Sequence, residues 1–176
     1  MYIYFLNILK IVYIIILIMD EFKNKWTMWY HNNKDNWELD TFKKIIDINN
    51  SENFWRLYNN FDKIGGITKR HYYLLKNGIT PMWQDKANYL GGCWSYKVPE
   101  EQAEELWTDL SVYLVNSLLC PKIVDEINGI SLCLKKNSSV VIKIWNSNSK
   151  NNSLKLINEE ILKKWGINII YMSHMS

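Results

Sequence analysis

Two of the nine tryptophans in this 176-residue chain stand where a hydrophobic core is not expected. Trp37 follows a polar run at 32–36, and Trp83 lies in the turn-rich segment 80–85. An indole on a loop is flat and amphipathic, so it can stack on a planar ligand, of which a nucleobase is the commonest. The alternative is that both rings cover the edge of a core, because exposed apolar side chains are ordinary. Their position alone leaves both interpretations open.

Composition indicates one globular domain with a sizeable core. Hydrophobic residues make up 48% of the chain and charged residues 22%, which is typical of a folded chain of this length. The net charge of +3 permits an anionic ligand, but a general nucleic-acid-binding surface would be more strongly basic. Cys93, Cys120 and Cys133 occur singly, which argues against a disulfide framework and against a zinc site.

Catalytic chemistry finds no support in the spacing of reactive residues. His31, His71 and His174 lack the spacing of metal ligands, and the glycine pairs at 65–66 and 91–92 are not phosphate loops. The carboxylates are scattered, whereas hydrolysis assisted by a metal would need them clustered. We therefore expect a binding protein rather than an enzyme, with no metal and no cofactor.

The first nineteen residues are almost entirely apolar, interrupted by Asn7 and Lys10. A signal or membrane anchor is one interpretation, although the uninterrupted run is shorter than the roughly 20 residues that span a bilayer and no small-residue cleavage site follows. A packed helix or strand is the second. The third is a translation start at Met19, which the abrupt change to polar residues at 20–25 favours. Residues 20–176 are then expected to form a single domain.

Hydrophobic periodicity predicts the elements that must position the two tryptophans. Alternating or bounded apolar runs predict strands at 25–31, 39–48, 70–76, 93–98, 130–134, 140–145 and 167–172. Helical spacing predicts three helices, which Ser51, Pro99 and Ser153 introduce, the last of them ending at Trp165. Because strands outnumber helices and many connections suit hairpins, we expect an α+β fold in which helices cover one face of an antiparallel sheet.

The order of the aromatic motifs is similar to that of a known family. Trp-Thr-Met-Trp at 26–29 is followed by Trp37, Phe-Trp at 54–55, Asn-Gly-Ile-Thr-Pro-Met-Trp at 77–83 and Gly-Gly-Cys-Trp at 91–94. This series, over residues 23–174, resembles the eukaryotic translation initiation factor 4E family, whose members bind the mRNA cap. The resemblance implies a curved antiparallel sheet of about eight strands backed by three α-helices. Reduced thiols are simplest in a cytoplasmic protein, and we expect a monomer without a membrane partner.

The resemblance assigns the two loop tryptophans to the cap itself. Trp37 and Trp83 would hold 7-methylguanine between their rings, and Trp145 would pack near the methyl group. Methylation at N7 makes the purine cationic, so it gains stacking of about 1–3 kcal/mol per ring and a cation–π attraction of about 2 kcal/mol. An unmethylated guanine would lose the second contribution.

Gln84 departs from the family pattern, which has Glu after the second tryptophan. That carboxylate accepts hydrogen bonds from the guanine N1–H and N2–H, whereas an amide offers one acceptor and a pair of donor hydrogens. The charge attraction to a cationic base is also lost, and charge-assisted hydrogen bonds are about twice as strong as neutral ones. We expect cap binding that is weaker or altered in specificity, with Asp85 a candidate for partial compensation.

The phosphate-binding cations also depart from the family pattern. Lys135 and Lys136 match the first part of the basic set, but Val141 stands at its last lysine and Cys93 at an arginine. Lys143 lies two residues along the same predicted strand, so it projects from the same face as Val141 and is expected to reach the phosphates instead. The alternative for these lysines is an ordinary solvated hairpin.

The resemblance implies a second site on the dorsal surface, for a scaffold or repressor helix with a Tyr-x-x-x-x-Leu-hydrophobic motif. Trp55 matches the exposed family tryptophan and lies off the apolar stripe of its predicted helix. Asp109 and Val112 match an acid and a leucine, but Thr108 replaces another leucine. A simple position at the edge of the core remains the alternative for Trp55.

Two functions follow from these expectations. The first is a protein that binds the cap of mRNA and recruits the message for translation initiation. The second is a decoy or repressor that binds initiation scaffolds or repressors through the dorsal surface and binds the cap only weakly. Gln84 and Cys93 are the residues that keep the second function open.

Overall fold

A computed structural model describes residues 21–32, 35–66, 70–135, 139–166 and 168–175. The apolar extension at 1–19 lies outside the described residues. The strands are β1 (Trp26–His31), β2 (Lys43–Ile48), β3 (His71–Lys76), β4 (Gly92–Pro99), β5 (Ile127–Leu134), β6 (Ser139–Asn146) and β7 (Ile170–Ser173). The α-helices are α2 (Ser51–Tyr58), α3 (Glu100–Val115) and α4 (Glu159–Trp165).

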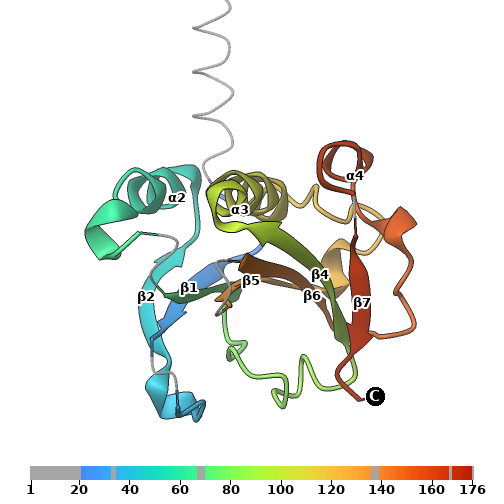
Figure 1. Ribbon diagram of the computed structural model, residues 1–176, viewed down its shortest axis with the longest axis horizontal. Coiled ribbons are helices and arrows are strands. Elements are labelled where there is room, and N and C mark those ends of the chain that lie inside the picture. The colour runs from blue at the N-terminus through green and yellow to red at the C-terminus, as the bar shows by residue number, and fades with distance from the viewer. Residues whose placement is uncertain (1–20, 33–34, 67–69, 136–138, 167, 176) are drawn as a thin grey trace, which may run out of the picture.

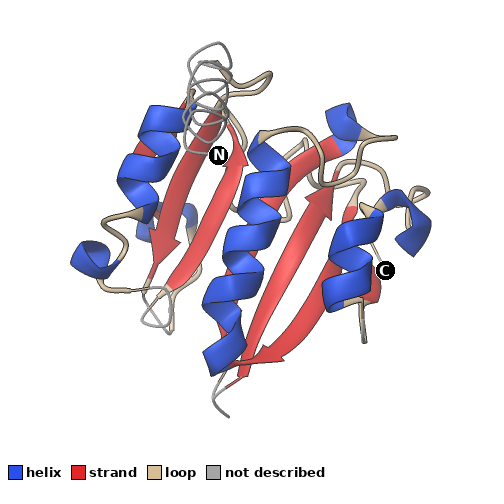
Figure 2. Ribbon diagram, turned by 90° about the horizontal axis from the view of Figure 1, so that it is seen from above, coloured by secondary structure: helices blue, strands red, loops and turns tan. Residues whose placement is uncertain are grey.

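The strands form one curved sheet in the order β2-β1-β3-β5-β6-β4-β7, and all neighbouring pairs are antiparallel. All three α-helices lie over one face of this sheet (Figures 1 and 2). The predicted α+β class is therefore confirmed. In the described part of the chain the sheet has seven strands, against the roughly eight that were predicted.

The main core lies between the sheet and the helices. Trp26, Trp94 and Trp107 are fully buried in it, and burying such rings contributes about 25 cal/mol for each Å² of apolar surface removed from water. A smaller cluster lies on the other face of the sheet, built around Phe42, Tyr73, Leu75, Cys93 and Trp145. Because side chains alternate along a strand, one strand supplies both clusters: Tyr72 enters the main core and Tyr73 the smaller one.

The predicted start of the first helix is wrong by one residue. Asn50 is the cap of α2, because its Oδ1 accepts a hydrogen bond from the Asn53 amide at 2.9 Å, and Ser51 is the first helical residue. The predicted strand at 39–48 is also shorter than expected. Leu39–Thr41 form a 3-10 turn, and pairing with β1 begins at Lys43.

The third helix begins later than predicted. Ser153 caps only a short 3-10 turn, Leu154–Leu156, through a hydrogen bond from the Lys155 amide to its side chain. Ile157 then takes an extended conformation and is buried, which interrupts the helical path. Asn158 is the true cap of α4. Sequence cannot separate these two starts, because Ser and Asn are both good caps.

Gly129 allows β5 to pass close to β3. Its φ is 149°, and a Cβ built there would lie 2.2 Å from the carbonyl oxygen of Leu74. We expect Gly129→Ala to lower the free energy of unfolding by about 1–3 kcal/mol or more, from backbone strain and the added clash. Urea unfolding measures this loss. Gly78→Ala is the matched control, since Gly78 also has positive φ but open space around it; equal losses for both variants would show that the close approach does not matter.

Candidate functional site

The helix-free face of the sheet contains a hollow of about 300 Å³. It is lined by Trp37, Phe42, Tyr73, Pro81, Met82, Trp83, Gln84, Ser131, Cys133, Lys143 and Trp145. The long connection between β3 and β4, drawn in green in Figure 1, passes below this face and supplies four of those residues. The structure therefore brings together five of the predicted site residues, which come from three separate parts of the chain.

Trp37 and Trp83 are the most exposed rings of this hollow. Their side chains are 45% and 49% exposed, although indoles of this size are usually buried. Trp37 lies on the connection between β1 and β2, and Trp83 on the connection between β3 and β4. Both rings thus present apolar surface to solvent within one hollow, as a stacking site requires.

His31 packs against the ring of Trp37, a contact that the sequence did not predict. The imidazole is fully buried and stacks on the indole, with ring centroids 4.3 Å apart and an interplanar angle of 24°. The Nε2 atom of His31 lies 2.8 Å from the carbonyl oxygen of Asn36, which fixes the ring against the segment that carries Trp37. Phe42 packs against the same imidazole at 4.5 Å. The only signal in the sequence was that His31 ends a predicted strand.

Trp145 forms the floor. It is buried, and its Nε1–H donates to the Ser131 hydroxyl at 2.9 Å, so its orientation is fixed. Lys143 is paired with Ser131 across the strands β5 and β6 and projects from the same face as Trp145. Among the described residues that line the hollow, Lys143 is the one cation and there is no carboxylate.

The loop that carries Trp83 is held by Asp85. One carboxylate oxygen accepts hydrogen bonds from the Thr80 amide at 2.9 Å and the Thr80 hydroxyl at 2.7 Å, and the other accepts from the Ala87 amide at 2.9 Å. Burial alone would raise the pKa of Asp85, but these hydrogen bonds outweigh it and hold the pKa below its ordinary value. Asp85 is therefore occupied within its own loop and is not available to compensate for Gln84.

Gln84 is an exposed residue of this loop and lines the hollow. Its side chain is exposed, and no hydrogen bond joins it to any described residue. Both functional groups of the amide are consequently available to a ligand in the hollow. Its orientation relative to Trp83 is set by the loop rather than by a contact of its own.

The other residues predicted to bind the phosphates are not among the described residues that line the hollow. Lys135 is exposed at the end of β5 and is not one of the lining residues, and Lys136 lies outside the described residues. Cys93 is buried in the smaller cluster, with no charge to offer. Val141, at the position of the family lysine, faces Cys133 across the strands.

The predicted dorsal residues belong to the helices α2 and α3, on the opposite face of the sheet from the hollow. Trp55 on α2 is 48% exposed, as predicted. Asp109 on α3 accepts hydrogen bonds from Lys164 at 2.7 Å and from the Trp165 indole at 2.8 Å. Val112 is half-buried against the core. Asp109 borders a depression between α3 and α4, and Trp55 is not one of its lining residues.

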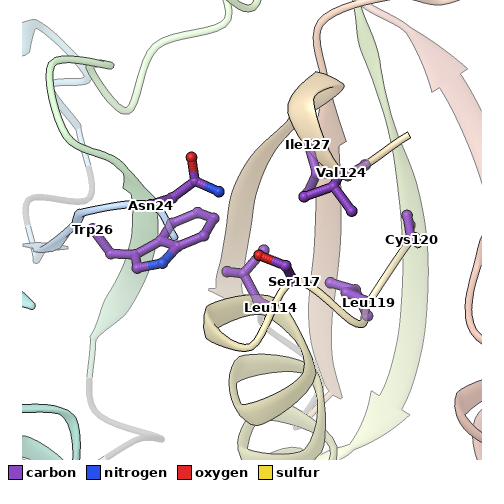
Figure 3. Close-up of a pocket in the computed structure, with 8 residues that line it drawn as sticks. All are labelled: Asn24, Trp26, Leu114, Ser117, Leu119, Cys120, Val124 and Ile127. Carbon is purple, nitrogen blue, oxygen red and sulfur yellow. The ribbon is translucent and has the colours of Figure 1, made fainter. Parts of the chain in front are cut away.

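A further cavity lies between β1 and the end of α3 (Figure 3). Its volume is about 10 Å³, which is room for one water molecule and no more. The buried Ser117 hydroxyl and the Trp26 indole nitrogen have no partner among the described residues. This cavity is a packing gap and not a ligand site.

The described residues contain no group of three or more side chains that could hold a metal ion. Within the same residues, no helix is long and apolar enough to cross a bilayer.

Residues 21–175 match the family described as eukaryotic initiation factor 4E. In the described part of the chain, seven antiparallel strands backed by three α-helices, with exposed tryptophans in a hollow on the open face, agree with that match. The chain belongs to the eukaryotic initiation factor 4E family.

Individual members of this family are similar to the chain over most of its length. A eukaryotic translation initiation factor 4E of Candida albicans is 30% identical over 164 residues, which are 86% of this chain and 78% of that protein. One of Dictyostelium discoideum is 29% identical over 136 residues, 73% of this chain and 53% of that protein. The chain therefore spans between about half and three quarters of these two relatives.

Two solved structures have the same fold. One is the complex of C. elegans eIF4E-3 with the 4E-binding protein Mextli and a cap analogue, with a TM-score of 0.76, 27% identity and coverage of 88% of this chain and 92% of that one. The other is Ascaris suum eIF4E-3 with the m7G cap, with a TM-score of 0.75, 26% identity and coverage of 89% and 92%.

His71, which lies beside Trp37, should make folding sensitive to acid. Burial, His31 and Lys135 together lower the pKa of His71 from 6.5 to about 4, and its Nδ1 accepts a hydrogen bond from the Leu134 amide. Between these pH values the unfolded chain binds a proton that the folded chain does not, so stability falls as the pH falls from about 6.5 towards 4.

Urea unfolding at pH 7 and pH 5 compares wild type with His71→Gln, whose side-chain oxygen can still accept from the Leu134 amide. The variant should lose less stability between these two pH values than the wild type. An unchanged loss would show that His71 is not the group responsible.

Proposed function

We propose that this chain binds the 7-methylguanosine cap of mRNA between Trp37 and Trp83 and recruits the capped message for translation initiation in the cytoplasm. The observation that carries the proposal is the pair of half-exposed indoles that line one hollow above a third, fixed indole, Trp145. Membership of the family and the fold shared with the m7G-cap complex of the Ascaris suum protein support it.

Stacking supplies the main attraction in this proposal. A base between the two rings gains about 1–3 kcal/mol from each face. The positive charge that N7 methylation places on the purine adds a cation–π attraction of about 2 kcal/mol when the base is desolvated. No carboxylate occurs among the described lining residues, so the indole faces are the proposed means of distinguishing a methylated from an unmethylated guanine.

The phosphates are proposed to lie towards Lys143, with Lys135 and Lys136 beyond it. Lys143 is half-buried beside Trp145, on the strand that forms the floor. Lys143 is the one cation among the described lining residues, which predicts a shallow dependence of binding on salt, since each neutralised phosphate contributes to that slope. The triphosphate then adds affinity without specificity for the base.

Removing either indole should weaken the cap complex. We expect Trp37→Ala and Trp83→Ala each to reduce affinity for 7-methyl-GTP by about 10- to 100-fold, because each loses one stacking face. Fluorescence quenching and retention on a 7-methylguanosine resin measure the loss. Trp55→Ala is the matched control, an equally exposed indole on the helical face. Wild-type affinity in the Trp37 or Trp83 variant would contradict the proposal.

A second candidate function is binding of an initiation scaffold or repressor protein on the dorsal surface, without strong cap binding. Gln84 and the single lysine among the described lining residues favour a weak cap complex, and Trp55 keeps an exposed indole for a partner helix. The C. elegans protein of the same fold is described in complex with a 4E-binding protein. In this candidate Trp55, Asp109 and Val112 contact a Tyr-x-x-x-x-Leu-hydrophobic helix, and the chain acts as a monomer.

Titration with a fluorescent peptide of that motif tests the dorsal surface. Trp55→Ala should weaken binding by about tenfold or more, because a buried aromatic anchor commonly contributes over 1 kcal/mol at an interface. Trp83→Ala should leave peptide binding unchanged. If both variants bind the peptide as the wild type does, the partner does not use this surface.

A further inference from the structure

We infer that Gln84 reads the N1–H and O6 groups of the base and leaves the N2 amino group unread, so that the site accepts caps altered at N2. This inference rests on the proposed function and concerns which cap chemistry the same hollow admits. It makes Gln84 a specificity-determining residue rather than only a weakened copy of a carboxylate.

The pattern of donors and acceptors permits a single paired arrangement. The guanine edge presents O6 as an acceptor, followed by N1–H and N2–H as donors. A carboxylate has acceptors only, so it pairs with N1–H and N2–H. The Gln84 amide has one acceptor and one donor group, so opposite N1–H and N2–H its nitrogen would face a donor. Both amide groups are satisfied only when the oxygen accepts from N1–H and the nitrogen donates to O6.

No carboxylate among the described residues of the hollow is available to read N2. The lining residues include no carboxylate, and both oxygens of Asp85 accept hydrogen bonds from Thr80 and Ala87. Two backbone carbonyls of the same loop already accept hydrogen bonds. The Met82 carbonyl accepts from the Asn88 side chain at 2.8 Å, and the Thr80 carbonyl accepts from the Met82 amide at 2.8 Å.

The setting of Gln84 suits this arrangement. Its side chain is exposed and makes no hydrogen bond to a described residue, so its amide is free to turn its nitrogen towards O6. The loop that carries it is held by several hydrogen bonds, which Asp85 and Asn88 make within it. A base paired through N1 and O6 leaves N2 beyond the amide, and no carboxylate among the described lining residues is there to read it.

Three triphosphates separate the two patterns of recognition: 7-methyl-GTP, 7-methyl-ITP, which lacks the N2 amino group, and N2,N2,7-trimethyl-GTP, in which N2 carries no hydrogen. Fluorescence titration of the wild type should give dissociation constants within about threefold of one another, since no hydrogen bond to N2 is lost. Gln84→Glu should bind 7-methyl-GTP more tightly. The same variant should bind the other two about tenfold more weakly than 7-methyl-GTP, because one carboxylate oxygen loses its donor.

Gln84→Met is the matched control, because it keeps the length of the side chain and removes both polar groups. It should weaken all three ligands to a similar degree. The inference is overturned if wild type discriminates against 7-methyl-ITP or the trimethyl ligand by about tenfold or more while binding 7-methyl-GTP, which would leave the proposed function standing. Failure of the wild type to bind all three ligands would instead overturn both the proposed function and this inference.

Discussion

Two large apolar rings must stay exposed to water if they are to close on a flat, charged base. Water favours the opposite outcome, in which such rings bury themselves in the nearest core. The fold prevents this by fixing what lies beneath each ring. Trp37 rests on the buried imidazole of His31, and Trp83 lies on a loop held by the carboxylate of Asp85. The exposure of both rings within one hollow depends on these two supports.

The two faces of the sheet have different roles, because one packs against the helices and the other carries the hollow. Ile144 enters the core beneath the helices, whereas its neighbour Trp145 forms the floor of the hollow. Period-two alternation was visible in the sequence, so the class of fold and most strands could be predicted from it. Helix starts could not, because Ser153 and Asn158 both have the chemistry of a cap and only tertiary packing selects between them.

The site was predictable to the extent that it depends on residue type and local setting. Polar surroundings indicated that Trp37 and Trp83 are exposed, and the position of Trp55 off its apolar stripe indicated the same. The contact of His31 with Trp37 depends on a loop that folds back over the end of a strand, which periodicity does not encode. Asp85 likewise accepts hydrogen bonds within its own loop. These bonds form only in the folded loop, so the sequence suggested Asp85 as a candidate ligand.

Contacts of the N7-methyl group with the indole rings test the central claim most directly. Nuclear Overhauser effects measured on the complex with 7-methyl-GTP report which side chains lie within a few ångströms of that methyl group. We expect cross-peaks to the ring protons of Trp37, Trp83 and Trp145, with none to Trp55. Cross-peaks that include Trp55, or that omit both Trp37 and Trp83, would show that the base binds elsewhere and would contradict this account.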